Sequence, residues 1–278
     1  MHAANEVTRR GRELLDLVCR ELASRGVTLL EADTDGVYFA VPESFTEEDE
    51  RRVVAEVDAI LPARVKLEYD GRYASMLSHE PKNYALLPYA GPLVLRGVAF
   101  RSSRAEPFGE AFLRGAVASL LAFDVAGVRK AYRDAIMALR RRELPTYDVS
   151  SRVRLTKTVA EYLATRELRR ELTYEALLVN GRTHWTPGER IRVYRARRGR
   201  AGLLLDADDD DGEAPVLDPR DYDIDYYVRI LRDTFAARLA RAFTPEDFET
   251  VFADPGQPSL FESSVQAIRP ILTRASLD

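Results

Sequence analysis

The sequence predicts an α+β fold, in which an antiparallel sheet with helices on one face is followed by a mainly helical region. Apolar residues recur at helical spacing over 4–25, and a strand–turn–strand pattern follows at 27–41. A second helical pattern and several short apolar runs come next, before the spacing becomes mainly helical from Phe108 onward. Helices and strands that are segregated along the chain in this way are typical of α+β proteins.

The first helix and the hairpin are predicted from local signals. Leucine and valine recur at helical spacing through residues 4–25, and Gly26 follows in the position that favours a left-handed cap. The runs Val27–Leu30 and Val37–Val41 are apolar and rich in strand-forming residues. An Asp-Gly pair between two such runs is a strong hairpin signal, because a two-residue turn of the right twist needs positive φ.

A second helix is predicted to begin at Thr46, a preferred N-cap residue that three acidic residues follow. Pro62 is predicted to end it. Its buried stripe is predicted to consist of Val53, Val54, Val57, Ile60 and Leu61. Strands separated by Gly or Pro are predicted after it at Val65–Tyr69, Tyr73–Leu77, Tyr84–Leu87 and Leu93–Phe100.

The character of the chain changes near residues 100–106, which predicts a domain boundary there. Helices are predicted beyond it at Phe108–Phe123, Val125–Arg142, 157–170, 173–180 and Tyr226–Phe243. The run Arg190–Arg200 alternates basic with apolar or aromatic residues, which indicates a strand with one charged face. That face either lies against phosphates or protects an exposed edge strand by its charge.

Composition is that of an ordinary globular protein. The 278 residues are 46% hydrophobic and 31% charged, and no apolar run approaches the length of a membrane span. The first residues lack the apolar core of a signal peptide, so we expect a cytoplasmic location. The single cysteine, Cys19, excludes an internal disulfide and a multi-cysteine zinc site, and the three histidines are scattered.

Charge is distributed unevenly along the chain. Residues 96–200 carry 23 Lys and Arg side chains against 11 Asp and Glu, although the whole chain has a net charge of −4. Such a basic segment is expected of a protein that binds a phosphate backbone, and a solvated helix surface is the plainer alternative. The acidic run 206–218 is predicted to be a solvated loop that stays away from nucleic acid.

Two carboxylates, Asp33 and Asp35, lie in the predicted hairpin turn. One interpretation is a surface turn, since Asp favours turns by bonding its own backbone. The other is a Mg²⁺ site, because this ion takes few protein carboxylates and completes its octahedron with water and substrate phosphates. A calcium loop fits less well, because the longer acidic spacing and the closing Glu are missing.

The segments flanking the hairpin favour the metal site. The inference rests on five short segments and on their order along the chain: Ala3–Arg12, Glu31–Gly36, Lys66–Tyr69, Pro81–Tyr84 and Arg96–Arg104. Together they resemble, in the same order, the end of the palm and the start of the thumb of family B DNA polymerases. The hairpin has that family's Asp-Thr-Asp core, and Lys82-Asn83-Tyr84 is similar to its Lys-x-Tyr motif. The resemblance extends over Ala3–Ala242, and it departs from the family at Glu31, where Tyr is usual, and at Gly36, where Ser is usual.

The resemblance implies a palm part at residues 1–103, a thumb at 104–278, and roles for individual residues. Asp35 would bind two Mg²⁺ ions, while Asp33 would shape the field or hold metal-bound water. Lys82 would meet backbone phosphate, and Tyr84 would lie near the duplex. The DNA-binding residues implied in and before the thumb are Arg101, Arg104, Arg140, Arg141, Arg142, Arg154 and Lys157.

The family's second palm aspartate, its fingers and its exonuclease have no counterpart in this sequence. We therefore expect no activity from the chain alone. One hypothesis is a subunit of a split DNA polymerase that acts on primer-template DNA and deoxynucleoside triphosphates with a complementary N-terminal chain. The second is a truncated fragment that acts only as a duplex DNA-binding module. A third, a non-polymerase Mg²⁺ phosphotransferase, has no support beyond the hairpin.

Overall fold

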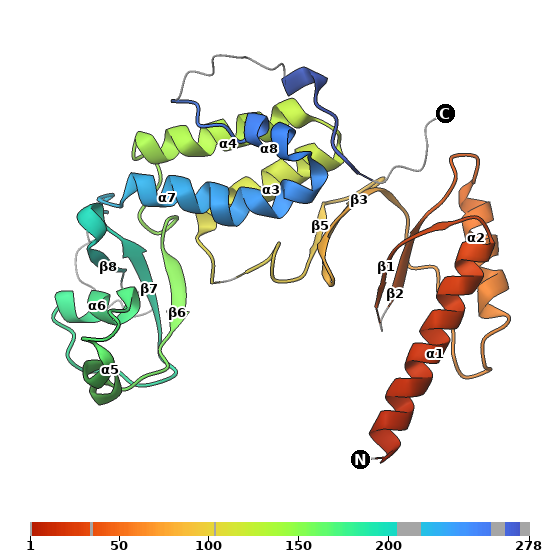
Figure 1. The fold of residues 1–278 in the computed structure, drawn as a ribbon, viewed down its shortest axis with the longest axis horizontal. Coiled ribbons are helices and arrows are strands. Elements are labelled where there is room, and N and C mark those ends of the chain that lie inside the picture. The colour runs from red at the N-terminus through yellow and green to blue at the C-terminus, as the bar shows by residue number, and fades with distance from the viewer. Residues whose placement is uncertain (1, 34–35, 103, 205–217, 257–264, 273–278) are drawn as a thin grey trace. The chain divides into compact units, whose positions relative to one another are not determined.

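The computed structural model describes residues 2–33, 36–102, 104–204, 218–256 and 265–272. The chain divides into two compact units (Figure 1). The first unit comprises Met1–Gly97 with Ile271–Asp278, and the second unit comprises Val98–Pro270. The predicted α+β class is confirmed, since the fold combines helices with small antiparallel sheets.

The first unit begins with α1 (His2–Ser24), which packs against β1 (Thr28–Asp33) and α2 (Glu47–Asp58). Gly26 ends α1 with a φ of 82°, as predicted for a left-handed cap. α2 begins at the predicted residue, because the Thr46 hydroxyl caps the Asp49 amide while the Asp49 carboxylate accepts from the Thr46 amide. An aliphatic core joins these elements and consists of Val18, Leu22, Val27, Val53 and Val57.

The hairpin is confirmed, but its turn differs from the prediction. β1 pairs antiparallel with β2 (Gly36–Ala40), and Asp33 pairs with Gly36. Gly36 is therefore the first residue of a strand, and its φ is not positive. The two residues between the strands, Thr34 and Asp35, lie outside the described residues.

The predicted strand at Val65–Tyr69 is wrong. No strand forms there, because polar groups of α2 bond this segment instead. The Leu67 amide donates to Asp58 Oδ1 at 2.7 Å, and the Tyr69 hydroxyl donates to Glu50 Oε2 at 2.5 Å. Ile60 is 46% exposed rather than part of the buried stripe, because the helix has already ended at Asp58.

A separate three-stranded antiparallel sheet has the order β3 (Tyr73–Glu80), β4 (Asn83–Pro88), β5 (Val94–Arg96). The strands of the first unit thus form two sheets where the sequence predicted one. The strand predicted at Leu93–Phe100 ends at Arg96, because Gly97 turns the chain with a φ of 81°.

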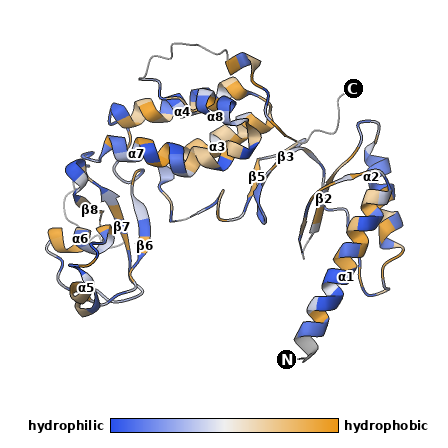
Figure 2. Ribbon diagram, viewed as in Figure 1, coloured by the Kyte–Doolittle hydropathy of each residue, from blue (hydrophilic) through white to orange (hydrophobic). Residues whose placement is uncertain are grey.

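Helices make up one part of the second unit. α3 (Pro107–Leu121) packs against α4 (Val125–Arg140), and α4 also contacts α7 (Ile224–Ile230) and α8 (Pro245–Val251). α3 is predominantly hydrophobic, whereas α4 mixes hydrophilic and hydrophobic residues (Figure 2). The single helix predicted at Tyr226–Phe243 is α7 followed by a π-helical turn, η3 (Leu231–Phe235), and a 3₁₀ segment, η4 (Ala236–Ala242).

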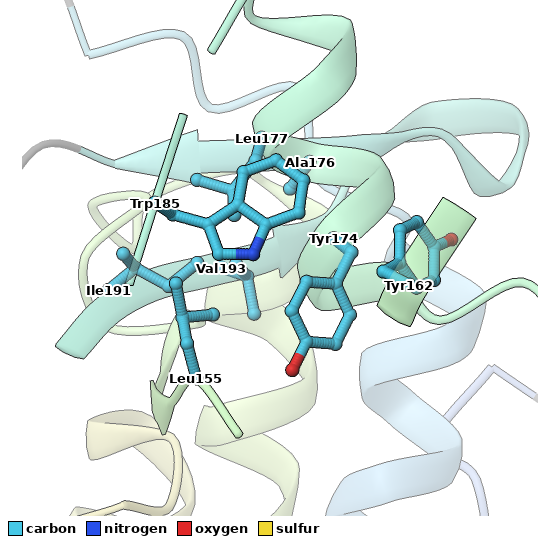
Figure 3. Packing of buried hydrophobic residues seen from close by; sticks show 8 residues of the cluster. All are labelled: Leu155, Tyr162, Tyr174, Ala176, Leu177, Trp185, Ile191 and Val193. Atoms are coloured by element: carbon cyan, nitrogen blue, oxygen red, sulfur yellow. The ribbon is translucent and has the colours of Figure 1, made fainter. Parts of the chain in front are cut away.

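The second unit also contains a sheet of order β6 (Ser151–Arg154), β7 (Arg190–Arg195), β8 (Ala201–Leu204). The short helices α5 (Val159–Thr165) and α6 (Leu172–Val179) belong to the same region, and α6 packs on β7 and β8. Tyr174 stacks on Tyr162 at 4.6 Å and contacts Trp185 within the buried cluster of Figure 3. The edge-strand interpretation of Arg190–Arg200 is wrong, since β7 is the central strand.

Candidate functional site

The side chain of Asp33 lies at the end of the β1–β2 hairpin and is paired with a lysine. Its Oδ2 atom is 3.0 Å from Lys82 Nζ. Lys82 lies in the tight turn between β3 and β4, in the other sheet of the first unit. The side chains of Asp33 and Lys82 are 32% and 68% exposed, so solvent reaches both charges. Two residues chosen from separate motifs of the sequence, Asp33 and Lys82, are therefore in direct contact.

Glu31 makes a second link between the hairpin and the same turn. Its Oε1 atom accepts a hydrogen bond from the Lys82 amide at 2.7 Å, and its Oε2 atom accepts one from the Ser78 hydroxyl at 3.0 Å. Glu31 and Asp33 lie two residues apart on one strand, so their side chains share a face. In the sequence, Glu31 stands out only as a departure from the family B pattern. A carboxylate within an otherwise apolar strand was the signal for this role.

The turn that carries Lys82 is enclosed by the backbone of Gly97. A Cβ atom at Gly97 would lie 2.2 Å from the Lys82 carbonyl oxygen and 2.8 Å from the Asn83 Cα. The φ of Gly97 is 81°, a conformation that residues with side chains rarely adopt. Glycine is therefore required at this position for the end of β5 to approach the turn.

Tyr84 packs against a second tyrosine and is half-buried. Its hydroxyl is 3.1 Å from that of Tyr38, and the two ring centroids are 4.9 Å apart. Tyr73 lies on the other side of Tyr38, with ring centroids 6.4 Å apart. Burial raises the pKa of the Tyr38 phenol well above its ordinary value, and the hydrogen bond with Tyr84 raises it further. The Tyr38 hydroxyl therefore stays protonated at neutral pH, and Tyr84 is held by its contact with the Tyr38 ring.

A cavity of about 550 Å³ lies beside this cluster within the first unit. Consecutive residues of β2 and of the segment 66–76 line its sides, and Leu22 and Val54 contribute apolar surface. Glu50 borders it and is 5% exposed. Its carboxylate is satisfied by Arg72 at 3.0 Å and by the Tyr69 hydroxyl, so it is a structural ion pair.

The basic residues predicted at the end of α4 differ in what they contact. Arg140 forms an ion pair with Asp254 at 2.7 Å. Arg142 donates to the Arg220 carbonyl and lies over the Tyr222 ring, 5.0 Å from its centroid. Arg141 is 63% exposed, and its guanidinium approaches Glu143 only to 3.7 Å. Of these three arginines, Arg141 is the best placed to meet a ligand.

The remaining predicted residues fall into two groups. Lys157 is bound on several sides: its ammonium pairs with Glu171 at 2.6 Å, and its carbonyl accepts from the Trp185 indole at 3.0 Å. Arg101, Arg104 and Arg154 are exposed.

One face of the β6–β7–β8 sheet carries four arginines, of which only Arg154 was predicted from the sequence as a DNA-binding residue. Arg154 is opposite Arg190 and Arg152 is opposite Arg192 in the β6–β7 register, so all four share a face. Arg192 is 8% exposed. It stacks on the Tyr147 ring at 3.9 Å and donates to Ser150 Oγ at 3.1 Å. Arg152, Arg154 and Arg190 extend the basic surface, and the alternating pattern of Arg190–Arg200 was a sequence signal for Arg190 alone.

The hairpin end offers part of a ligand set for a divalent cation. The donor at the hairpin end is a carboxylate, which is the ligand that Mg²⁺ prefers. Asp33 is described and Asp35 is not. Within the described ranges, no group of three or more His, Cys, Asp or Glu side chains gathers as a metal site. Of the acidic run 206–218, only Asp218 is described, and it accepts from Thr146 and Arg220.

Helices of the described part of the chain are all too short or too polar to cross a membrane.

The chain is similar in sequence to several known DNA polymerases. No family model matches the chain. The DNA polymerase of Pyrococcus horikoshii is 36% identical over 166 residues, which are 58% of this chain and 13% of that protein. DNA polymerase 1 of Pyrococcus abyssi is 42% identical over 98 residues, which are 34% of this chain and 13% of that protein. The DNA polymerase of Pyrococcus glycovorans is 30% identical over 166 residues, covering 58% of this chain and 21% of that protein.

Among solved structures, the family B DNA polymerase of Pyrobaculum calidifontis has a similar fold, with a TM-score of 0.63 and 20% identity. The match covers 88% of this chain and 30% of that one. The chain is therefore a relative of DNA polymerases in sequence and shares the fold of part of one. The resemblance to family B DNA polymerases that the sequence predicted is confirmed. The chain spans less than a third of each of these proteins.

Proposed function

We propose that this chain supplies the end of the palm, residues 1–103, and the thumb, residues 104–278, of a family B DNA polymerase. It takes part in template-directed DNA synthesis from deoxynucleoside triphosphates on primer-template DNA. A complementary N-terminal chain supplies the fingers and the other palm aspartate. The observation that carries the proposal is the contact of Asp33, in the Asp-Thr-Asp hairpin, with Lys82 of the Lys-x-Tyr segment at 3.0 Å. Two motifs that lie about fifty residues apart in the sequence meet at one point.

In nucleotidyl transfer, the primer 3′-oxygen attacks the α-phosphorus of the incoming nucleotide and pyrophosphate leaves. Bound Mg²⁺ ions would stabilise the attacking and leaving oxygens of this in-line displacement. Asp35 would hold the ions, and Asp33 would assist from the adjacent strand end. The Lys82 ammonium, already beside Asp33, would offer a positive charge to a backbone phosphate of the primer strand.

The second unit would hold the product duplex through its phosphates. The exposed residues Arg101, Arg104, Arg141 and Arg154 would contribute more than Arg140 and Lys157, which already pair with Asp254 and Glu171. Contacts of this kind position the duplex without reading its sequence, and they weaken steeply with salt.

The second candidate function, a duplex DNA-binding module without catalysis, is favoured by one observation. Arg152, Arg154 and Arg190 lie on one face of a sheet and would bind phosphates whether or not the hairpin carries metal ions. The first function needs the hairpin carboxylates and a complementary chain, whereas the second needs neither.

The experiment is primer extension by this chain, with and without a complementary N-terminal polymerase half. We expect extension only with both halves, and we expect Asp35→Ala to abolish it while duplex affinity stays nearly constant. Glu43→Ala, which removes an exposed carboxylate elsewhere in the first unit, is the matched control. Extension by the Asp35→Ala complex would refute the metal role, and duplex binding without extension by any pair would favour the binding module.

Salt dependence tests the assignment of the arginines. The double variant Arg141→Ala with Arg154→Ala should make the slope of log affinity against log salt shallower by roughly 2, because each lost phosphate contact contributes about 0.9. Arg140→Ala is the control and should change the slope little. Equal changes in both proteins would contradict the ranking of these arginines by their exposure.

A further inference from the structure

The Glu31 carboxylate connects two sheets that share no backbone pairing. The hairpin β1–β2 and the sheet β3–β4–β5 are separate in strand order. Glu31 on β1 accepts from Ser78 on β3 at 3.0 Å and from the Lys82 amide in the following turn at 2.7 Å. Hydrogen bonds to a carboxylate are stronger than those between neutral groups, so these two contacts orient the turn against the hairpin.

Lys82 itself has a backbone conformation that requires such support. Its φ is 65°, in the left-handed region that residues other than Gly, Asn and Asp rarely adopt. Glu31 holds its amide, and the close approach of Gly97 confines its carbonyl. Contacts on both sides of the residue therefore fix its backbone. A backbone held in this way determines the direction in which the side chain leaves it.

We infer that Glu31 is a positioning residue for the Lys82–Asp33 pair. By holding the Lys82 amide, it sets the turn so that the ammonium lies 3.0 Å from Asp33 Oδ2. Glu31 thus determines the position of the Lys82 ammonium relative to the hairpin carboxylates. That this position helps Lys82 to bind a primer phosphate rests on the proposed function, whereas the effect of Glu31 on the Lys82–Asp33 distance does not.

Chemical labelling of Lys82 tests the inference on the chain as it exists. A short pulse of acetic anhydride, read by mass spectrometry, reports how strongly the ammonium is held. Glu31→Ala should raise Lys82 acetylation about two- to fivefold, the range expected for release of a partly exposed ion pair. Glu31→Gln, which keeps an acceptor for the amide, should restore labelling to nearly that of the wild-type protein. Ser78→Ala, which removes one of the two donors, should give a smaller rise.

Two comparisons separate positioning from a general loss of structure. In an Asp33→Asn background the pair is already broken, so adding Glu31→Ala should raise Lys82 labelling no further. Glu80→Ala removes an exposed carboxylate two residues before Lys82 and should leave labelling unchanged. Lys66, which pairs with Asp58, serves as the internal reference. A rise that persists in the Asp33→Asn background, a parallel rise at Lys66, or no rise in Glu31→Ala would overturn the inference.

A second readout connects the pair to DNA. Fluorescence anisotropy with a primer-template duplex should show about two- to fivefold weaker binding for Glu31→Ala, with recovery in Glu31→Gln. If the wild-type chain binds no duplex, the proposed function fails while the labelling result still decides the role of Glu31. If the chain binds duplex and Glu31→Ala leaves its affinity unchanged, the link from the pair to phosphate is refuted.

Discussion

The second unit is built around wholly buried aromatic rings, whereas the first unit has an aliphatic core, and none of its described tyrosines is fully buried. Tyr132, Phe235 and Phe252 are at most 1% exposed in the second unit, and edge-to-face contacts connect such rings. In the first unit the core consists of valine and leucine side chains. Polar contacts from Glu31 and Asp33 connect its two sheets there.

The two units differ in the interactions that stabilise them. Aromatic side chains bury the largest apolar areas, so the second unit gains most from burial. The first unit relies more on hydrogen bonds and ion pairs that solvent reaches, and such pairs contribute little each. We therefore expect its sheets to open more readily than the helices of the second unit. The segments that carry a site are commonly drawn from the less stable part of a protein.

The largest effect is expected from Phe235→Ala in the second unit. Phe235 is 0% exposed, and its ring fills the space beside Gly109, where a Cβ atom would lie 2.1 Å from it. Removing the ring should lower the free energy of unfolding by about 3–5 kcal/mol, as large-to-small substitutions in cores do. Peptide-level hydrogen exchange should show the loss in 107–140 and 224–251.

The control for this substitution is Leu168→Ala, since Leu168 is 89% exposed and should cost almost nothing. Equal loss of protection in residues 5–96 would show that the two units unfold together and do not differ in stability.

The next effect concerns the turn that holds Lys82. Gly97→Ala should destabilise the first unit by about 2–3 kcal/mol, because it strains a left-handed backbone and forces Cβ against the Lys82 carbonyl. Gly11→Ala is the matched control: nothing lies within 4 Å of its Cβ, and alanine in a helix interior should add about 0.5–1 kcal/mol. Thermal unfolding of both variants measures the difference. Gly97→Ala with unchanged stability would mean that the turn is not tightly enclosed.

A smaller effect is expected from a charged pair of the second unit. Glu175 accepts from Arg166 Nε at 2.7 Å and from the Tyr162 hydroxyl at 2.6 Å. The hydrogen bond from Arg166 is the main reason that the pKa of Glu175 falls from 4.5 to about 2. The folded pKa is lower than the unfolded one, so the pair stabilises the fold above pH 4.5 and ceases to do so as the pH falls towards 2.

Glu175→Gln should therefore cost about 1–2 kcal/mol at pH 7, less than a buried charged hydrogen bond would, because Arg166 is a third exposed. Denaturant unfolding at a series of pH values should show that this difference narrows below pH 4.5. A difference that stays constant down to pH 2 would contradict the proposed ionisation of Glu175.

Much of the fold was predictable because local signals agreed with each other. α1, the hairpin, the Thr46 cap, α3 and α4 all formed where spacing and capping residues predicted them. The failures share a cause in tertiary contacts. Val65–Tyr69 has the composition of a strand, yet side chains of Asp58 and Glu50 take its polar groups, and no pattern within the segment reveals that.

The site was predictable in its parts but not in its arrangement. Asp33 and Lys82 were each predicted from a separate motif. Their contact depends on how the hairpin packs against the turn between β3 and β4, which neither motif indicates. Glu31 was noted only as an exception to a pattern, because its partners lie 47 and 51 residues away. The alternating pattern from Arg190 correctly predicted a strand, but it predicted an exposed Arg192. Arg192 is buried and stacks on Tyr147, and no local sequence pattern indicates such burial.

The smallest effect is expected from the helix caps, because both units contain the same kind of N-cap. Thr46 and Thr158 each form a capping box, in which the hydroxyl accepts from the third helical amide and the carboxylate there accepts from the cap amide. Thr46→Ala and Thr158→Ala should each cost about 1 kcal/mol, since capping depends on local geometry and not on the kind of core beneath. Denaturant unfolding with hydrogen exchange measures both. Similar costs would mean that the two units differ in stability only through their cores. A much larger cost for Thr46→Ala would mean that the first unit also depends on its caps.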